Sequence, residues 1–249
     1  MDAKGFGEPI SPLLTDRYLL TMCYSWMHSG KIDSHAVYEF FYRKNPFEHN
    51  FLVLCGINEA IDWLNRAKFS AQDIEYVRND FNLKPEDPFL GWLAKVDFSK
   101  LTVNAIPEGS VVFPHCPLII IEGPLGLVQL TETIILNKLN FPSLIATNAR
   151  LMKRVIGKGD LLEFGLRRAQ GPDGGLGGAY YACVGGAAAT SNVLAGARYG
   201  VPTVGTMAHS FVTSFSELED LDKRELSEQH KKFIRSEERR VGKECLRLC

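Results

Sequence analysis

The chain has 249 residues, of which 45% are hydrophobic and 23% charged, and its 28 basic and 29 acidic side chains nearly cancel. This balance is typical of a globular protein and lacks the basic excess expected of a nucleic-acid-binding protein. The apolar runs at residues 117–121 and 134–136 are far shorter than the ~20 residues that cross a bilayer. Residues 1–8 contain no signal-like apolar run, so we expect a cytosolic protein that binds neither membrane nor nucleic acid.

The first half of the chain is expected to mix helices and strands. Apolar residues recur every four positions in residues 12–28, which predicts an amphipathic helix that Gly30 ends. The elements expected next are strands at residues 36–42 and 51–54, a helix at 58–67, a helix from about Ser70, and three β-rich runs at 101–106, 110–113 and 118–122. Proline- and glycine-containing turns separate these three runs, which is typical of a tightly turning antiparallel unit.

The second half predicts helices at residues 129–139 and 143–156, followed by a strand, a glycine-rich loop, a helix and a strand. The strands are expected at residues 161–164 and 201–204 and the helix at about 190–199, and the glycine-rich stretch covers residues 164–196. An alternation of strand and helix indicates a parallel barrel or an open sheet. We therefore predict an N-terminal α/β domain in residues 1–125 and the first part of an α/β barrel in residues 126–234.

Six cysteines, at positions 23, 55, 116, 183, 245 and 249, form no Cys-x-x-Cys pair and have no companion histidines at zinc-ligand spacing. This pattern favours buried, reduced thiols over disulfides or a metal held by thiolates. No metal-binding residues are predicted.

His209 is the best candidate for catalysis. It follows a strand-like segment, and Thr206 and Ser210 beside it carry hydroxyl groups. An imidazole that titrates near neutral pH can attack phosphorus or transfer a proton. The alternative is a solvent-exposed histidine in a polar loop.

The glycine-rich stretch is a second candidate, because exposed backbone N–H groups together with Arg167 and Arg168 suit phosphate or carboxylate. The alternative is a flexible turn with solvated arginines. A dinucleotide-binding loop would need Gly-x-Gly-x-x-Gly, and a Walker A loop would need Gly-Lys-Ser or Gly-Lys-Thr, and neither occurs.

Six short segments carry a further signal. They are residues 14–18 (LTDRY), 43–47 (RKNPF), 107–114 (PEGSVVFP), 140–148 (NFPSLIATN), 166–174 (LRRAQGPDG) and 205–212 (GTMAHSFV). Taken together and in this order, they resemble nicotinate phosphoribosyltransferases, from about residue 9 to about residue 220. The resemblance implies a type II phosphoribosyltransferase fold, in which an N-terminal α/β domain packs beside an irregular α/β barrel and a homodimer completes the active site.

The resemblance also implies an activity. Such enzymes join nicotinate to 5-phosphoribosyl 1-diphosphate, with ATP hydrolysis coupled through a phosphohistidine and with Mg²⁺ bound to the diphosphates. By the family's pattern, Tyr18 and Phe164 stack on the pyridine ring, Tyr18 from the partner subunit, and Arg167 reaches a phosphate. Thr206 contacts nicotinate with Ser210 beside it, and His209 is the phosphorylated histidine. Core packing is the alternative for Tyr18, because it lies on the apolar stripe of its helix.

The sequence departs from the family's pattern in two places. Ala187 and Ala188 stand where the family usually has an aromatic and an acidic residue, and the family continues well beyond the end of this chain. Residues 235–249 read like a translated sequencing adapter, so we expect a non-native tail there rather than a charged helix, and we expect a barrel cut at this point to fold poorly alone. Two alternatives to the main function stay open: a nicotinamide phosphoribosyltransferase-like enzyme, and a non-catalytic dimerising paralogue.

Overall fold

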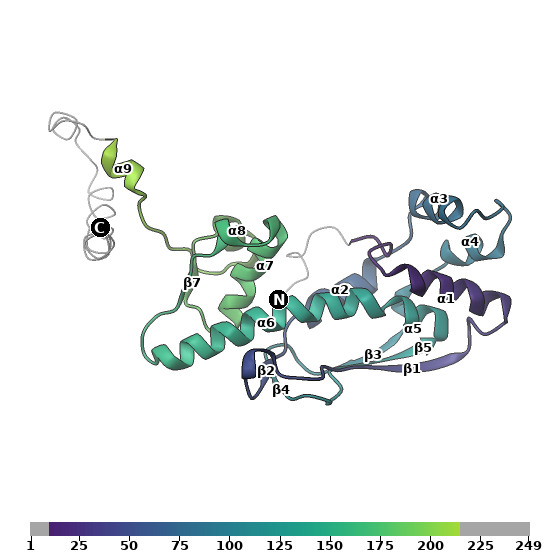
Figure 1. Cartoon of the computed structure of the whole chain (residues 1–249), viewed down its shortest axis with the longest axis horizontal. Coiled ribbons are helices and arrows are strands. Elements are labelled where there is room, and N and C mark those ends of the chain that lie inside the picture. The colour runs from purple at the N-terminus through teal and green to yellow at the C-terminus, as the bar shows by residue number, and fades with distance from the viewer. Residues whose placement is uncertain (1–9, 215–249) are drawn as a thin grey trace. The chain divides into compact units, whose positions relative to one another are not determined.

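The computed structural model describes residues 10–214, which divide into a first unit that ends at Pro202 and a second that starts at Thr203 (Figure 1). The helices of the first unit are α1 (Arg17–His28), α2 (Ile57–Arg66), α3 (Ala71–Asp80), α4 (Pro88–Leu93), α5 (Leu125–Leu130), α6 (Glu132–Ile156), α7 (Gly171–Val184) and α8 (Val193–Tyr199). Its strands are β1 (His35–Phe40), β2 (Leu52–Val53), β3 (Thr102–Ala105), β4 (Val111–Val112), β5 (Ile119–Pro124), β6 (Leu162–Glu163) and β7 (Ala189–Thr190). The second unit holds α9 (His209–Thr213).

The predicted elements of the first half are confirmed with shifted ends. Helix α1 begins at Arg17 rather than at residue 12, and Gly30 follows its end with φ +70°, as expected for a glycine that stops a helix. Helix α3 begins at a capping box, in which Ser70 and Asp73 each accept a hydrogen bond from the other's backbone N–H.

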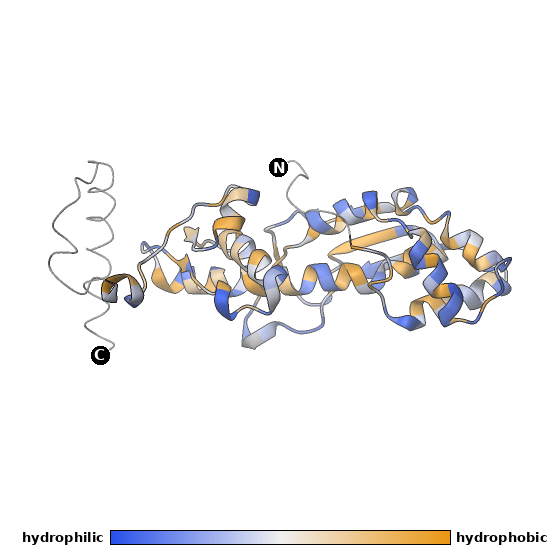
Figure 2. Cartoon of the chain, turned by 90° about the horizontal axis from the view of Figure 1, so that it is seen from above, coloured by the Kyte–Doolittle hydropathy of each residue, from blue (hydrophilic) through white to orange (hydrophobic). Residues whose placement is uncertain are grey.

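The predicted antiparallel unit is only partly correct. Strand β5 lies at the centre of a three-stranded antiparallel sheet between β1 and β3, whereas β4 pairs with β2 in a separate ladder. Side chains alternate along β5, and Ile119 and Ile121 are almost fully buried. Helix α5 contacts β1 and β5. One face of the sheet therefore packs on the main core, and Figure 2 shows how hydrophobic its strands are.

The two helices expected at residues 129–139 and 143–156 are one helix. Helix α6 runs unbroken for 25 residues with Pro142 inside it. Proline has no N–H, so the carbonyl of Lys138 loses the hydrogen bond it would normally accept. Gly56 lies against that carbonyl oxygen, and a Cβ on Gly56 would lie only 1.9 Å from it. The backbone of Gly56 thus approaches α6 so closely at this carbonyl that a side chain at position 56 would not fit.

Hydroxyl groups of α6 hold the edge of β2. The Thr147 Oγ1 accepts from the Val53 N–H at 2.9 Å, and the Ser143 Oγ accepts from the Cys55 N–H at 3.0 Å. The Ser143 hydroxyl also donates to the Cys55 carbonyl at 3.2 Å. Both hydroxyls are buried, and they satisfy backbone groups that would otherwise be desolvated without partners.

The glycine-rich stretch is mostly helical rather than a loop. A short 3₁₀ turn at Leu166–Arg168 leads into α7, which starts with Pro172 in its first turn. Strands β6 and β7, which precede and follow α7 in the chain, pair in parallel with each other. This arrangement confirms the predicted change from an antiparallel to a parallel pattern, although the second strand is β7 at Ala189–Thr190 rather than at residues 201–204.

The cysteines differ in exposure. Cys23 and Cys55 are buried, as predicted, but Cys183 is half-buried and Cys116 is exposed, in the turn between β4 and β5. Cys116 lies in the proline-containing turn expected between residues 113 and 118, and its exposure follows from that turn, in which His115 has φ +63°. Cys245, Cys249 and the tail at residues 235–249 lie outside the described residues.

The domain boundary near residue 125 falls where β5 meets α5, and it stays a prediction. Within residues 10–214, no helix combines the length and hydrophobicity that crossing a bilayer requires.

Candidate active site

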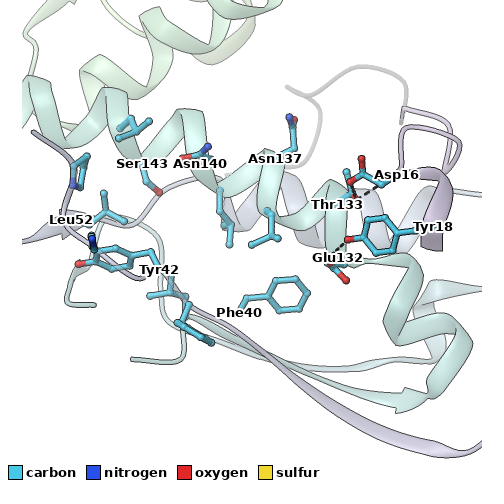
Figure 3. A pocket seen from close by; sticks show the side chains of 17 residues that line it. Asp16, Tyr18, Phe40, Tyr42, Leu52, Glu132, Thr133, Asn137, Asn140 and Ser143 are labelled. Carbon is cyan, nitrogen blue, oxygen red and sulfur yellow. Dashed lines mark hydrogen bonds between the residues drawn. The ribbon is translucent and has the colours of Figure 1, made fainter. Parts of the chain in front are cut away.

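Tyr18 projects from α1 into a pocket of about 640 Å³ between α1, α6 and the strand β1 (Figure 3). Its side chain is 46% exposed, so the core-packing alternative is wrong. The phenol hydroxyl donates a hydrogen bond of 2.5 Å to Glu132 Oε1, at the first residue of α6. Phe40 and Asn140 line the same pocket. The pocket thus combines aromatic and polar walls.

A chain of hydrogen bonds connects Tyr18 to the interior. Glu132 Oε2 accepts from the Gln129 side-chain amide at 2.6 Å, and Gln129 Oε1 accepts from the Tyr38 hydroxyl at 2.6 Å. Gln129 is only 3% exposed. The hydrogen bond to Glu132, together with some burial and the carboxylate's charge, raises the pKa of Tyr18 to about 12. Tyr18 therefore stays protonated, and remains a donor, throughout the neutral range.

Phe164 and Arg167 follow the carboxyl end of β6. Both are exposed, and the Glu163 carboxylate fixes the turn that carries them. One carboxylate oxygen accepts from the Gly165 N–H and the other accepts from the Thr190 hydroxyl at 2.6 Å. One side chain thereby ties the turn after β6 to β7, so that Phe164 and Arg167 lie at the carboxyl end of the parallel strand pair.

Tyr18 and the turn around Phe164 border different pockets along α6. Tyr18 contacts Glu132 at the start of the helix, whereas the turn around Phe164 borders a second pocket that Asn148 and Met152 of α6 also line. The first pocket is lined by α6 residues between 132 and 144, and the second by α6 residues between 141 and 152. Neither of these two pockets is lined by both Tyr18 and Phe164.

The three remaining candidates lie together in the second unit. His209 is the first residue of α9, Ser210 follows it, and Thr206 lies three residues before it. All three are exposed. The second unit thus has an exposed imidazole and two exposed hydroxyls within five residues, and the roles of these residues stay predictions.

Comparison with known proteins identifies the family. Residues 13–140, more than half of the chain, match the family model described as the nicotinate phosphoribosyltransferase (NAPRTase) N-terminal domain. The chain belongs to the nicotinate phosphoribosyltransferase family. A relative of that name from Caenorhabditis elegans is 48% identical over 225 residues, and one from Homo sapiens is 43% identical over 206 residues. These matches cover 90% and 82% of this chain, but only 40% and 38% of the relatives.

Solved structures support the type II phosphoribosyltransferase fold. Human nicotinic acid phosphoribosyltransferase superposes with a TM-score of 0.74 and 42% identity, covering 81% of this chain and 41% of that one. The nicotinate-nucleotide pyrophosphorylase of Pyrococcus furiosus superposes with a TM-score of 0.64 at 22% identity, covering 83% and 44% of the two chains, and at that identity it supports the fold alone. The predicted fold class is confirmed.

The sequence did not single out Glu132 and Glu163. Glu132 is the first residue of α6 and accepts a hydrogen bond from the Tyr18 hydroxyl. Glu163 is the last residue of β6 and accepts a hydrogen bond from the Gly165 N–H in the turn that carries Phe164. For Glu163, the available signal is an acidic residue at the end of the expected strand, three residues before the segment 166–174. For Glu132 the sequence holds none, because its partner is 114 residues away.

Two further carboxylates have structural roles. Glu108 accepts from the Asn58 N–H at 2.9 Å and so caps α2, whose N-cap residue is Gly56. Burial is the largest cause that raises the pKa of Glu108. Glu59 accepts from the Tyr181 hydroxyl at 2.8 Å and lies 3.3 Å from the Lys138 ammonium, and it connects α2 with α6 and α7.

The alanines at the family departure differ from each other. Ala187 is 8% exposed and packs with Ala149 and Ala182, whereas Ala188 is exposed and its N–H donates to the Leu161 carbonyl at 2.7 Å. The backbone of Ala188 thus helps to hold the start of β7 beside β6, and this hydrogen bond does not require an acidic side chain.

Among residues 10–214, no group of three or more His, Cys, Asp or Glu side chains converges as a metal site would require. The carboxylate nearest to Phe164 and Arg167, that of Glu163, already uses both oxygens for hydrogen bonds. These residues alone do not form a cage for Mg²⁺.

Proposed function

We propose that this chain is part of an enzyme that joins nicotinate to 5-phosphoribosyl 1-diphosphate, forming nicotinate mononucleotide and diphosphate. The observation that carries the proposal is the 48% identity over 225 residues to the Caenorhabditis elegans nicotinate phosphoribosyltransferase. The chain spans about 40% of the length of its curated relatives, so the activity is proposed for the complete protein.

The chemistry suits the proposed residues. The pyridine nitrogen forms a bond to the anomeric carbon of the ribose as the bond to diphosphate breaks, and the diphosphate leaves with the electron pair. Positive charge develops on the sugar, so catalysis depends on orienting the pyridine and on neutralising the leaving group. Tyr18 and Phe164 are proposed to bind the two faces of the pyridine ring, and Arg167 a phosphate group.

ATP is the proposed co-substrate. A His209 ring nitrogen attacks the γ-phosphorus, a P–N bond forms, and the bond to the β-phosphate oxygen breaks to release ADP. Thr206 and Ser210 lie within three residues of His209, and their hydroxyls are proposed to contact substrate. Phosphorylation is proposed to increase affinity for the ribosyl substrate and so to favour product.

Mg²⁺ is proposed to bind through the oxygens of the two phosphate substrates rather than through a protein cage. Mg²⁺ commonly keeps several waters and is held by substrate phosphates and few carboxylates. The Mg²⁺-free substrates are therefore expected to be inactive, whereas the folded protein should not lose stability when chelator is added.

The active unit is proposed to be a homodimer. Support comes from Tyr18 and the turn around Phe164, which border different pockets of the described chain. In a twofold-symmetric dimer, Tyr18 of each subunit is proposed to enter the site that Phe164 of the other subunit borders.

One set of assays tests the proposal. The complete protein is incubated with 5-phosphoribosyl 1-diphosphate, ATP, Mg²⁺ and either nicotinate or nicotinamide, and mononucleotide is measured. Mononucleotide from nicotinate supports the proposal, whereas product from nicotinamide alone favours the nicotinamide-specific alternative. The absence of product from both favours the non-catalytic paralogue.

A labelling experiment tests the role of His209. With ATP labelled at the γ-phosphate, the unmodified protein should become labelled in an acid-labile, base-stable form, and His209→Ala should not. Label that persists in His209→Ala removes His209 from the mechanism.

A further inference from the structure

Packing alone does not fix the ring of Tyr18. Its side chain is 46% exposed on the surface of α1. Exposed side chains exchange between rotamers on the picosecond to nanosecond scale. A stacking ring contributes most when it is already oriented, because binding does not then have to restrict its motion. A fixed acceptor for the hydroxyl would hold such a ring in one orientation before the ligand binds.

Glu132 is such an acceptor. Its Oε1 receives the Tyr18 hydroxyl at 2.5 Å, and Figure 3 shows the carboxylate and the phenol pointing toward each other at the edge of the pocket. The negative charge strengthens the hydrogen bond relative to one between neutral groups. As the first residue of α6, Glu132 also lies where the helix dipole favours a negative charge.

The position of Glu132 is itself fixed from the interior. Gln129 donates to its second oxygen at 2.6 Å, and the buried Gln129 is held in turn by the Tyr38 hydroxyl at 2.6 Å. Tyr38 belongs to β1, so the orientation of an exposed ring on α1 is set by the sheet as well as by α6. Neighbouring hydrogen bonds of this kind reinforce each other.

We propose that Glu132 is a positioning residue for Tyr18, and that its carboxylate, anchored by Gln129, holds the ring in the orientation that binds a pyridine substrate. The proposal rests on the proposed function, because that function supplies the pyridine ligand. Glu132 acts only through Tyr18 and does not contact the reacting atoms.

Steady-state kinetics of the complete protein form the first test. Tyr18→Phe removes the hydroxyl, Glu132→Ala removes the acceptor, and each should raise KM for nicotinate about fivefold, with little change in kcat. Because both changes break the same bond, the double variant should be no worse than either single variant. Glu132→Gln retains an acceptor oxygen and should restore most of the lost affinity.

Asp80→Asn is the matched control. It removes another contact of α1, the ion pair between Arg17 and Asp80 at 2.9 Å, which lies outside the pocket. KM for nicotinate should change less than about twofold in this variant. Equal effects of Asp80→Asn and Glu132→Ala would overturn the proposal, because loosening of α1 would then explain both. Additive effects of Tyr18→Phe and Glu132→Ala would also overturn it.

Titration of Tyr18 is the second test and needs no substrate. In protein carrying tyrosine labelled with ¹³C at Cζ, the resonance that disappears in Tyr18→Phe is that of Tyr18. This resonance should barely shift by pH 10.5 in the unmodified protein, whose Tyr18 pKa is about 12, and should shift there in Glu132→Ala. Ionisation near pH 10 in both proteins would overturn the proposal. An unmodified protein that makes no mononucleotide would overturn the proposed function without altering this titration, so the two failures are distinguishable.

Discussion

Gly56 and Gly30 both have left-handed backbone, but only Gly56 touches a neighbour there. Gly56 has φ +93°, and an added Cβ would lie 1.9 Å from the Lys138 carbonyl oxygen, whereas Gly30 has φ +70° with nothing within 4 Å of such a Cβ. A substitution at Gly30 would therefore introduce backbone strain alone, whereas one at Gly56 would also introduce a steric clash. The conflict at Gly56 involves helix backbone, which cannot rotate away as a side chain can.

Gly56→Ala is therefore expected to lower the free energy of unfolding by at least about 3 kcal/mol, against about 1 kcal/mol for Gly30→Ala. Chemical denaturation of the complete protein measures both values. Similar losses at the two glycines would mean that α6 shifts away from Gly56 at little cost.

Glu108 gives a prediction about pH. Burial raises its pKa above 4.5, so the folded state binds the proton more tightly than the unfolded state. The contribution of Glu108 to stability is therefore fully present below pH 4.5 and is lost as the pH rises through the folded pKa. Asp97 is the opposite case, because hydrogen bonds from Ser99 lower its pKa below 3.8. Its contribution is present above pH 3.8 and is lost as the pH falls.

Thermal unfolding of Glu108→Gln between pH 4 and pH 7 tests this sign. The variant should gain stability relative to the unmodified protein as the pH rises from 4.5, since it lacks the ionising carboxyl. Asp97→Asn, followed from pH 5 down to pH 3, should show the reverse trend and a small amplitude. A pH-independent difference for Glu108→Gln would contradict the raised pKa.

At the scale of elements, the two-residue strand β2 pairs with β4 along one edge, and α6 supplies hydrogen-bond partners along the other edge. Its hydroxyls at Ser143 and Thr147 complete hydrogen bonds that a longer sheet would supply. Both residues fall in the segment 140–148 that carries the family resemblance. Part of that segment therefore has a structural role, in addition to the pocket that Asn140 and Ser143 line.

Ser143→Ala should lower the free energy of unfolding by about 1–3 kcal/mol, because the buried Cys55 N–H and carbonyl lose their partner. Ser29→Ala removes an exposed hydroxyl that donates to the Trp26 carbonyl and should cost less than about 0.5 kcal/mol. Hydrogen exchange should show faster exchange of the Cys55 amide in Ser143→Ala. Unchanged protection would mean that water replaces the hydroxyl.

Local patterns predicted most elements but failed where tertiary contacts outweigh propensity. Pro142 predicted a break, yet α6 continues through it because close packing with Gly56 and the Ser143 hydroxyl stabilises this stretch. The glycines of this stretch predicted a loop, yet residues 171–184 form α7, and a Cβ on Gly185, which caps the helix, would lie 2.3 Å from the Ala146 carbonyl oxygen of α6. The proline at the start of α7 was the available signal for a helix.

The positions of the candidate site residues were likewise predictable only where a local pattern of the sequence carries the information. Phe164 and Arg167 could be assigned to the end of a parallel strand from local pattern, and the structure agrees with that position. Tyr18 came from the resemblance alone. Its hydrogen bond to Glu132 joins residues far apart in sequence, and no local pattern contains such information.

At the scale of the whole molecule, α6 connects the two pockets that the candidate residues border. Because it is one helix rather than two, the contact of Tyr18 with Glu132 and the pocket beside the turn of Phe164 keep fixed positions along one axis. The proposed homodimer predicts that a working site uses Tyr18 of one copy and Phe164 of the other.

Complementation tests this prediction. Tyr18→Ala and Phe164→Ala proteins should each be nearly inactive, but a mixture allowed to exchange subunits should recover about a quarter of the unmodified activity. Half of the dimers are then mixed, and each mixed dimer has one site without either substitution. Two preparations of Tyr18→Ala mixed in the same way should recover nothing. No recovery in the Tyr18→Ala and Phe164→Ala mixture would place both rings in the same subunit's site, or show that subunits do not exchange.

Because α6 is one unbroken helix, it tolerates few insertions or deletions along its length. Adding or removing one residue would turn everything beyond it by about 100° and shift it by about 1.5 Å. Such a change before Ser143 would carry its hydroxyl away from β2 while leaving Glu132 beside Tyr18. Insertions and deletions among natural relatives should consequently gather in the turn at residues 157–161 and be absent between residues 132 and 147.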